Sequence, residues 1–224
     1  MPGNLSIVHK TDVVASAVNL VQSAAKDFGG TCTQKFSQCT NPVAQIINLL
    51  PSTKDGICLM LAAKWVGEYA NGKSMWNSIY FGGKFNQAAI VTIMHNFIDD
   101  EVLGINWMDV RTKYFSQHNV KHIATPAPRG DGNTASAMIG ARLADAILAV
   151  GSGSFITLDM SGPGGAHAVA AWNAGSTYLF FDPNYGEFQF TNAVGYRQWL
   201  DLLTRLSGYK SMFGMVSSDV WKRK

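Results

Sequence analysis

The sequence changes its pattern near Ser152, and this change limits the fold more than any other feature. After this point, short runs of residues with high β-propensity alternate with turns rich in Gly, Pro, Asn and Ser; the runs cover 154–160, 167–172, 177–181 and 187–190. Such spacing is typical of an antiparallel meander. We expect a helix over 196–206 to follow, and a last strand over 211–217.

The part of the chain before residue 152 carries hydrophobic residues at helical spacing instead. The expected helices cover 11–27, 42–50, 57–69, 85–97 and 135–150. Helices that precede a sheet, rather than alternating with its strands, indicate an α+β fold. We expect a helical N-terminal part packed against a C-terminal antiparallel sheet in one domain over 31–224. The segment 1–30 is either a helix of that domain or a separable N-terminal arm.

The composition supports a globular chain with an ordinary core. Of its 224 residues, 47% are hydrophobic and only 15% are charged, which is too little charge for disorder. The net charge of +3 comes with no Lys/Arg cluster longer than the tail 221–224, so no nucleic-acid partner is expected. Peripheral contact with an anionic membrane stays open. No apolar run is long enough for a transmembrane helix, no secretory signal is recognisable, and we expect a monomer.

The three cysteines, Cys32, Cys39 and Cys58, are odd in number and lack C-x-x-C spacing. This pattern predicts neither a zinc site nor a disulfide framework. At least one thiol is free, and free thiols are favoured over a Cys32–Cys39 bridge. The acidic run 99–101 fits a solvated helix end better than a cation site. We expect no metal and no organic cofactor.

Cys58 is expected in the first turn of the helix over 57–69. A thiol there faces unpaired backbone N–H groups and the positive end of the helix dipole. Both favour the thiolate, which is the nucleophilic form. The alternative is a buried structural cysteine, because Cys is among the most buried residue types.

His167 lies between the glycine-rich segment 162–165 and a strand of small residues. Small neighbours leave room for another chain to approach the imidazole, and we expect the run 160–165 to be a flexible loop that lets a substrate backbone pass near His167. The alternative is an ordinary core histidine in an apolar strand.

Asp182 ends an apolar strand at the turn Pro183-Asn184-Tyr185-Gly186. The strands over 167–172 and 177–181 are joined by a short turn, and His167 and Asp182 are about equally far from it. Hairpin pairing therefore predicts that the carboxylate reaches the Nδ1–H of His167, orienting the ring and stabilising its charged form. The alternative is that Asp-Pro-Asn-x-Gly is only favourable turn chemistry.

The segments 56–58, 64–65, 167–170 and above all 180–188 (Phe-Phe-Asp-Pro-Asn-Tyr-Gly-Glu-Phe) resemble the YopT/AvrPphB family. These are type III-secreted cysteine protease effectors of bacterial pathogens and symbionts, and the resemblance covers roughly 52–224. It implies a papain-like fold, with Cys58 as nucleophile, His167 as general base and then acid, and Asp182 as the residue that orients His167.

The chain departs from this family in one respect. Such enzymes take an oxyanion donor partly from an amide side chain shortly before the nucleophile, and 51–57 holds neither Asn nor Gln. The nearest upstream amides are those of Gln45 and Asn48. The backbone N–H of Cys58 is one candidate donor, and Ser52 or Thr53 is a candidate for the other.

The resemblance implies a protein that a bacterium secretes into the host cytoplasm, where it cleaves specific signalling proteins. In this family these are membrane-anchored small GTPases or signalling kinases. Some members also remove their own N-terminal segment, for which 25–31 is the candidate site. Two alternatives stay open: a Cys-dependent acyltransferase or deamidase with the same three residues, and a catalytically dead module that binds a host target.

Overall fold

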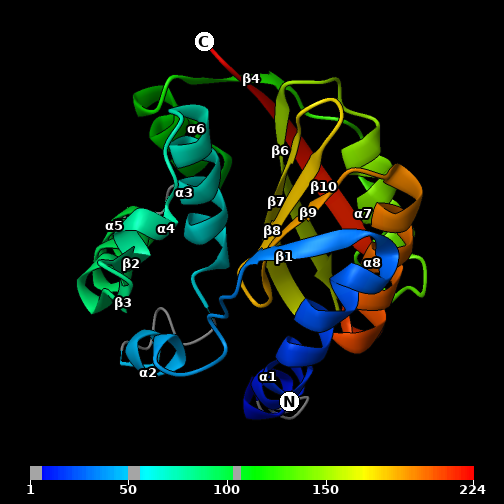
Figure 1. Cartoon of the computed structure of the whole chain (residues 1–224), viewed down its shortest axis with the longest axis horizontal. Helices are drawn as coiled ribbons and strands as arrows, with labels where there is room; N and C mark the ends of the chain where they lie inside the picture. The colour runs from blue at the N-terminus through cyan, green and yellow to red at the C-terminus, as the bar shows by residue number, and fades with distance from the viewer. Residues whose placement is uncertain (1–6, 50–55, 103–106) are drawn as a thin grey trace.

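The computed structural model describes residues 7–49, 56–102 and 107–224 (Figure 1). Its helices are α1 (Ile7–Ala24), the 3-10 helix η1 (Ala25–Phe28), α2 (Val43–Ile47), α3 (Cys58–Ala70), α4 (Trp76–Ile79), α5 (Gln87–Val102), α6 (Trp107–Gln117), α7 (Ile139–Leu148), α8 (Ala193–Leu206) and α9 (Tyr209–Met212). Its strands are β1 (Gly30–Gln34), β2 (Tyr80–Phe81), β3 (Lys84–Phe85), β4 (Val120–Ala124), β5 (Arg129–Gly130), β6 (Ser154–Gly162), β7 (Gly165–Asn173), β8 (Tyr178–Asp182), β9 (Gly186–Phe190) and β10 (Met215–Arg223).

The main sheet has the strand order β1-β9-β8-β7-β6-β10-β4, and β5 pairs with the beginning of β10. Its neighbouring strands run antiparallel, so β6 to β9 form the expected meander. Strands β2 and β3 form a separate hairpin. The α+β fold class is therefore confirmed.

Each face of the sheet carries a hydrophobic core, and the sheet stands between two groups of helices (Figure 1). One core joins the sheet to α1, α7 and α8, and it includes Val21, Leu143, Val169, Phe180 and Trp199. The other core joins the sheet to the helical part around α3, and it includes Leu61, Trp65, Ala168, Phe181 and Trp221. Because both faces are covered, the central strands are apolar on both sides.

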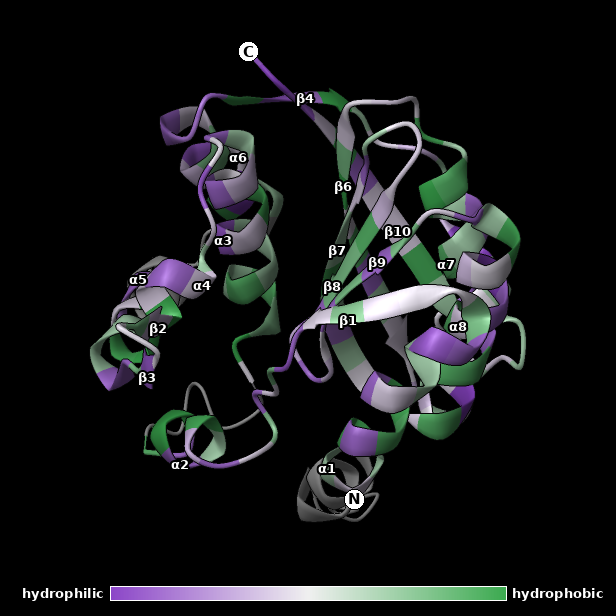
Figure 2. Ribbon diagram, viewed as in Figure 1, coloured by the Kyte–Doolittle hydropathy of each residue, from purple (hydrophilic) through white to green (hydrophobic). Residues whose placement is uncertain are grey.

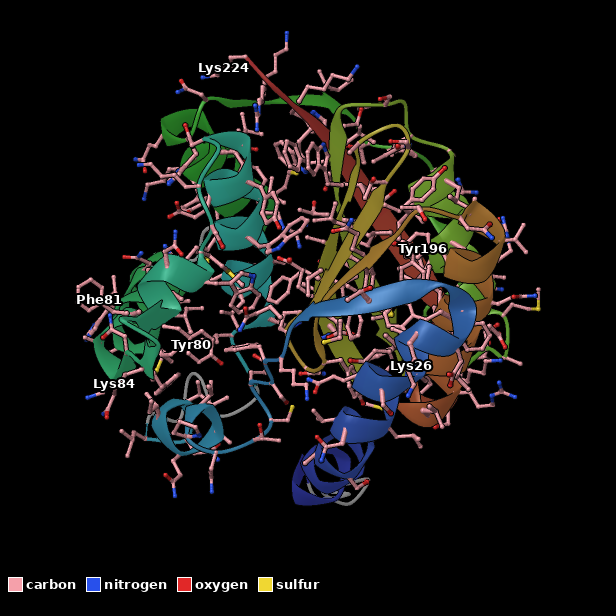
Figure 3. All side chains as sticks on the ribbon, in the orientation of Figure 1. Lys26, Tyr80, Phe81, Lys84, Tyr196 and Lys224 are labelled. Carbon is pink, nitrogen blue, oxygen red and sulfur yellow. The ribbon has the colours of Figure 1, made fainter. Side chains whose placement is uncertain are left out.

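Helix α8 shows how the sequence produces one of these layers. Asn192 caps its start by accepting a hydrogen bond from Val194 N at 2.8 Å. Tyr196, Trp199 and Leu203 recur at helical spacing and are almost fully buried. Figure 3 shows Tyr196 between α8 and the sheet, where its ring lies 5.5 Å from that of Tyr178.

A buried carboxylate ties the helical part to the sheet. Glu187 on β9 accepts hydrogen bonds from the indole N–H groups of Trp65 (2.6 Å) and Trp76 (2.9 Å). Its other oxygen accepts from the hydroxyls of Thr33 (2.7 Å) and Tyr69 (3.1 Å). Four donors satisfy a charge that would otherwise be costly to bury. This contact holds α3, whose first half is hydrophobic (Figure 2), against the strands.

Three details differ from the sequence-based expectations. Strands β1 and β4 of the main sheet lie before residue 152, in the part of the chain expected to be helical, and α9 occupies 209–212, so that the last strand begins only at Met215. The run 160–165 is not a flexible loop: its first three residues end β6, and Gly162 then pairs with Gly165 across a tight turn. The last residue of α9 packs against this turn, since Gly164 N donates to Met212 O at 2.8 Å.

The part of α1 whose side chains are described packs onto the sheet. Val18 and Val21 are buried, and the side-chain amide of Gln22 donates to Tyr185 O at 2.9 Å. Whether 1–30 is a separable arm stays a prediction. Among the described residues, no helix combines the length and the apolar character needed to cross a membrane.

Candidate active site

The structure places Cys58 at the first position of α3, as expected. The preceding residue, Ile57, has non-helical dihedral angles, and the first turn holds no acidic side chain that would oppose a thiolate. The Sγ of Cys58 accepts a hydrogen bond from the backbone N–H of Ala168 at 3.4 Å. That N–H lies beyond Ala170, the last residue of β7 that pairs with β8. The thiol is half-buried.

His167 and Asp182 meet across the β7–β8 hairpin. Their side chains form a hydrogen bond of 2.8 Å between Nε2 and Oδ1, and both residues are buried. The prediction that Asp182 contacts Nδ1 of His167 is therefore wrong. The β7–β8 pairing ends with Ala170 opposite Phe181, and continuing this register would put Val169 across from Asp182. His167 lies two residues before Val169, and its ring meets the carboxylate through Nε2. The Cys58 thiol forms a side-chain hydrogen bond with His167, and Nδ1 is the ring nitrogen that the bond to Asp182 leaves for it.

The carboxylate of Asp182 is fixed by two further donors that the sequence did not reveal. Its Oδ1 accepts from Asn184 N at 2.8 Å, and its Oδ2 accepts from the Tyr209 hydroxyl at 3.2 Å. That hydroxyl in turn accepts from the side-chain amide of Asn184 at 2.8 Å. Asp182 is completely buried, so these contacts hold its charge in one orientation towards His167.

The electrostatics of this cluster favour a thiolate–imidazolium pair. Burial raises the pKa of Cys58, but the hydrogen bond and charge of His167, together with the Ala168 N–H, outweigh burial and leave the pKa below its usual value. Burial likewise lowers the pKa of His167, but Asp182 and then Cys58 outweigh it and raise that pKa to about 10. Nearby Asp159 opposes the thiolate. The cluster therefore holds an activated nucleophile beside a proton donor.

The other two cysteines have the opposite character. All three thiols are free. Burial raises the pKa of Cys32 to about 11 and that of Cys39 to about 12. The lowered pKa of Cys58 is therefore a property of its position and not of thiols in this protein generally.

The amide that packs next to the nucleophile comes from Gln38, which the sequence did not point to. Its side chain lies against the peptide that precedes Cys58, with Oε1 accepting from Ile57 N at 2.9 Å. The side chains of Gln45 and Asn48 are exposed instead. The other candidates, Ser52 and Thr53, lie outside the described residues. Gln38 reaches the site because β1, which ends four residues earlier, pairs with β9, and no local pattern predicts this pairing between residues 153 to 160 positions apart, from Gln34 with Glu187 to Gly30 with Phe190.

In the part of the chain whose side chains are described, no group of three or more His, Cys, Asp or Glu residues could hold a metal ion. The side chains of the acidic run 99–101 lie outside that part.

Comparison with known proteins gives matches over most of the chain. The Peptidase_C58 family, described as Yersinia/Haemophilus virulence surface antigen, matches residues 22–214. Cysteine protease YopT of Yersinia pestis is 29% identical over 200 residues, which is 84% of this chain and 62% of YopT. The protein adenylyltransferase and cysteine protease IbpA of Histophilus somni is 27% identical over 212 residues, which is 88% of this chain and 5% of IbpA. The chain thus matches somewhat less than two-thirds of the length of YopT.

A solved structure matches the fold. The crystal structure of the Pseudomonas avirulence protein AvrPphB aligns with a TM-score of 0.53 and 18% sequence identity, and the alignment covers 75% of this chain and 92% of AvrPphB. This likeness confirms the papain-like fold expected from the sequence. The family match covers well over half of the chain, and the predicted relationship to YopT and AvrPphB is confirmed: the chain belongs to the Yersinia/Haemophilus virulence surface antigen family, Peptidase_C58.

Proposed function

We propose that this chain is a cysteine endopeptidase that a bacterium delivers into the host cytoplasm, and that it cleaves specific host proteins through Cys58, His167 and Asp182. The observation that carries the proposal is the contact of Cys58 with His167. It joins the one cysteine with a lowered pKa to an imidazole that a buried carboxylate holds charged.

In the first half of the reaction, the Cys58 thiolate attacks the carbonyl carbon of the scissile peptide bond. The negative charge that develops on the carbonyl oxygen lies near the start of α3, where the Cys58 backbone N–H is available as a donor. The imidazolium of His167 gives its proton to the leaving amine, and the C–N bond breaks. The products are an amine with a new N-terminus and a thioester on Cys58.

In the second half, His167 is neutral and acts as the base. It removes a proton from a water molecule that attacks the thioester carbonyl. The C–S bond breaks, the carboxylic acid leaves, and the thiolate–imidazolium pair is restored. Asp182 keeps Nε2 of His167 occupied during both halves, so that Nδ1 is the nitrogen that moves the proton.

The proposed targets are host signalling proteins, either small GTPases or kinases, and the proposed delivery route is type III secretion. The names of the relatives support the protease activity, since YopT is a cysteine protease and IbpA carries a cysteine protease beside an adenylyltransferase. Membership of a virulence antigen family supports action on a host.

The test compares three purified proteins in a host-cell lysate: wild type, Cys58→Ala, and Cys32→Ala as a matched control. Cys32 is a half-buried thiol whose pKa is raised to about 11. New protein N-termini are then mapped by mass spectrometry. We expect the same small set of new N-termini with wild type and Cys32→Ala, and none with Cys58→Ala.

The other outcomes point to different functions. If wild type produces no new N-terminus but changes the mass of intact host proteins, transfer or deamidation by the same three residues replaces proteolysis. If it changes nothing and only binds a host protein, the chain is a binding module, and the proposal is wrong.

A further inference from the structure

Gln38 connects the two halves of the candidate active site through three hydrogen bonds. Its backbone N–H donates to Pro183 O at 2.8 Å, and its side-chain Nε2 donates to Asn184 Oδ1 at 2.8 Å. Its Oε1 accepts from Ile57 N at 2.9 Å. Gln38 and Asn184 are about 95% buried, and Ile57 is completely buried. The first two bonds hold Gln38 to the turn after Asp182, and the third holds the residue before Cys58.

The hydrogen-bond partners fix the orientation of this amide. A backbone N–H can only donate, so the atom that faces Ile57 must be the carbonyl oxygen Oε1. Nε2 then faces Asn184 Oδ1, which also accepts from the Cys39 thiol at 3.1 Å. The opposite orientation would set two donors against each other at Ile57.

The backbone around Ile57 is shaped to receive the amide. Gly56 has a φ of +108°, which side-chain-bearing residues rarely adopt, and a Cβ there would lie 3.1 Å from Gln38 Nε2. At the other end, Asn184 contacts Asp182 through its own N–H and through the Tyr209 hydroxyl. A continuous set of buried hydrogen bonds therefore runs from the orienting carboxylate to the peptide before the nucleophile.

We propose that Gln38 is a positioning residue that holds the first turn of α3 in place against the turn carrying Asp182, so that Cys58 stays in contact with His167. The proposal rests on the proposed function of Cys58. The ladder between β7 and β8 fixes His167 relative to Asp182, but Cys58 belongs to a different layer. The Glu187 contacts hold α3 further along the helix, at Trp65 and Tyr69, whereas the Gln38 amide joins the residue before Cys58 to the turn after Asp182.

The experiment measures the rate at which iodoacetamide alkylates Cys58 as a function of pH, in the full chain. Gln38→Met keeps the length of the side chain and removes its hydrogen bonds, and Asn184→Ala removes the partner at the other end. Gln189→Met, at an exposed glutamine on β9, is the matched control. We expect the two test variants to shift the alkylation profile to higher pH. At about pH 6 their rates should fall about two- to tenfold, the range that one neutral hydrogen bond spans.

Gln38→Met and Asn184→Ala interrupt the same set of hydrogen bonds. The alkylation rate of the double variant should therefore fall no further than that of the more affected single variant. An unchanged profile in a folded Gln38→Met protein overturns the proposal, even if peptide cleavage is slower. If Gln38→Met does not fold, an unchanged profile in Asn184→Ala overturns it equally. Failure of the proposed function looks different: wild type itself would then show no fast alkylation at Cys58 compared with Cys58→Ala.

Discussion

Replacing Asp182 by Asn removes one charge from the site and changes little else. The Oδ1 of an Asn side chain can still accept from His167 Nε2 and from Asn184 N, as the carboxylate does. The Tyr209 hydroxyl, which now donates to Oδ2, can turn and accept from the new amide. The variant therefore isolates the contribution of the negative charge to the thiolate–imidazolium pair.

The size of the effect follows from the pKa of His167, which is raised from 6.5 to about 10. At about 1.4 kcal/mol per pKa unit, this rise favours the imidazolium by about 5 kcal/mol, shared between Asp182 and Cys58. If Asp182→Asn removes a quarter to a half of this free energy, the thiolate population of Cys58 at acidic pH falls about 10- to 100-fold. Cys58 and His167 titrate as a coupled pair, so the apparent pKa values in the alkylation profile belong to the pair and not to either residue alone.

Alkylation by iodoacetamide from about pH 4 to about pH 9 measures this population directly. The thiols of Cys32 and Cys39, with pKa values raised to about 11 and about 12, stay protonated over this range. The signal therefore belongs to Cys58, and Cys58→Ala supplies the baseline.

The directions of the pKa shifts of Cys58 and His167 decide how the alkylation rate changes with pH. A lowered pKa at Cys58 and a raised pKa at His167 place the reactive pair in the pH window between the two values. Asp182→Asn narrows this window from both sides, because it destabilises the imidazolium and thereby the thiolate. An alkylation profile of Asp182→Asn identical to that of wild type would show that the charge of Asp182 does not stabilise the thiolate–imidazolium pair.

Two further predictions concern the surroundings of the site. Glu187→Ala leaves the buried indole N–H groups of Trp65 and Trp76 without their acceptor, at about 1–3 kcal/mol each, so we expect urea unfolding to show a loss of about 2–6 kcal/mol. Asp159→Asn removes a charge that raises the pKa of Cys58, so alkylation at acidic pH should become faster, by less than about tenfold. Unchanged unfolding of Glu187→Ala would contradict the role of the Glu187 contacts. Slower alkylation of Asp159→Asn would contradict the effect of Asp159 on Cys58.

The meeting of His167 and Asp182 could be predicted because it depends on local structure. The turn over 173–176 closes a hairpin whose strands are recognisable by composition, and hairpin pairing then fixes which residues meet. The position of Cys58 at the start of α3 was also predictable, because a turn-rich segment runs into a long apolar stretch. Which nitrogen of His167 meets Asp182 could not be predicted, since this depends on the two-residue offset of His167 from the position across from Asp182.

The contacts of Gln38 and Glu187 could not be predicted, because they depend on pairing between distant parts of the chain. Strand β1 is short and lacks a clear alternation of polar and apolar residues, yet it pairs with β9. Helix α6 was missed for a similar reason, since its buried residues Val110 and Phe115 are interspersed with charged ones. Tertiary packing, not local propensity, decides such segments.

The most direct test of the central claim is to trap the acyl group on the nucleophile. Wild-type protein is mixed with a peptide that spans a cleavage site found in the lysate, the reaction is quenched with acid within the first turnover, and the protein is mapped by mass spectrometry. We expect the N-terminal part of the peptide to be attached to Cys58 as a thioester that disappears as hydrolysis is completed. Cleavage that proceeds with the acyl group on another residue, or that persists in Cys58→Ala, would contradict it.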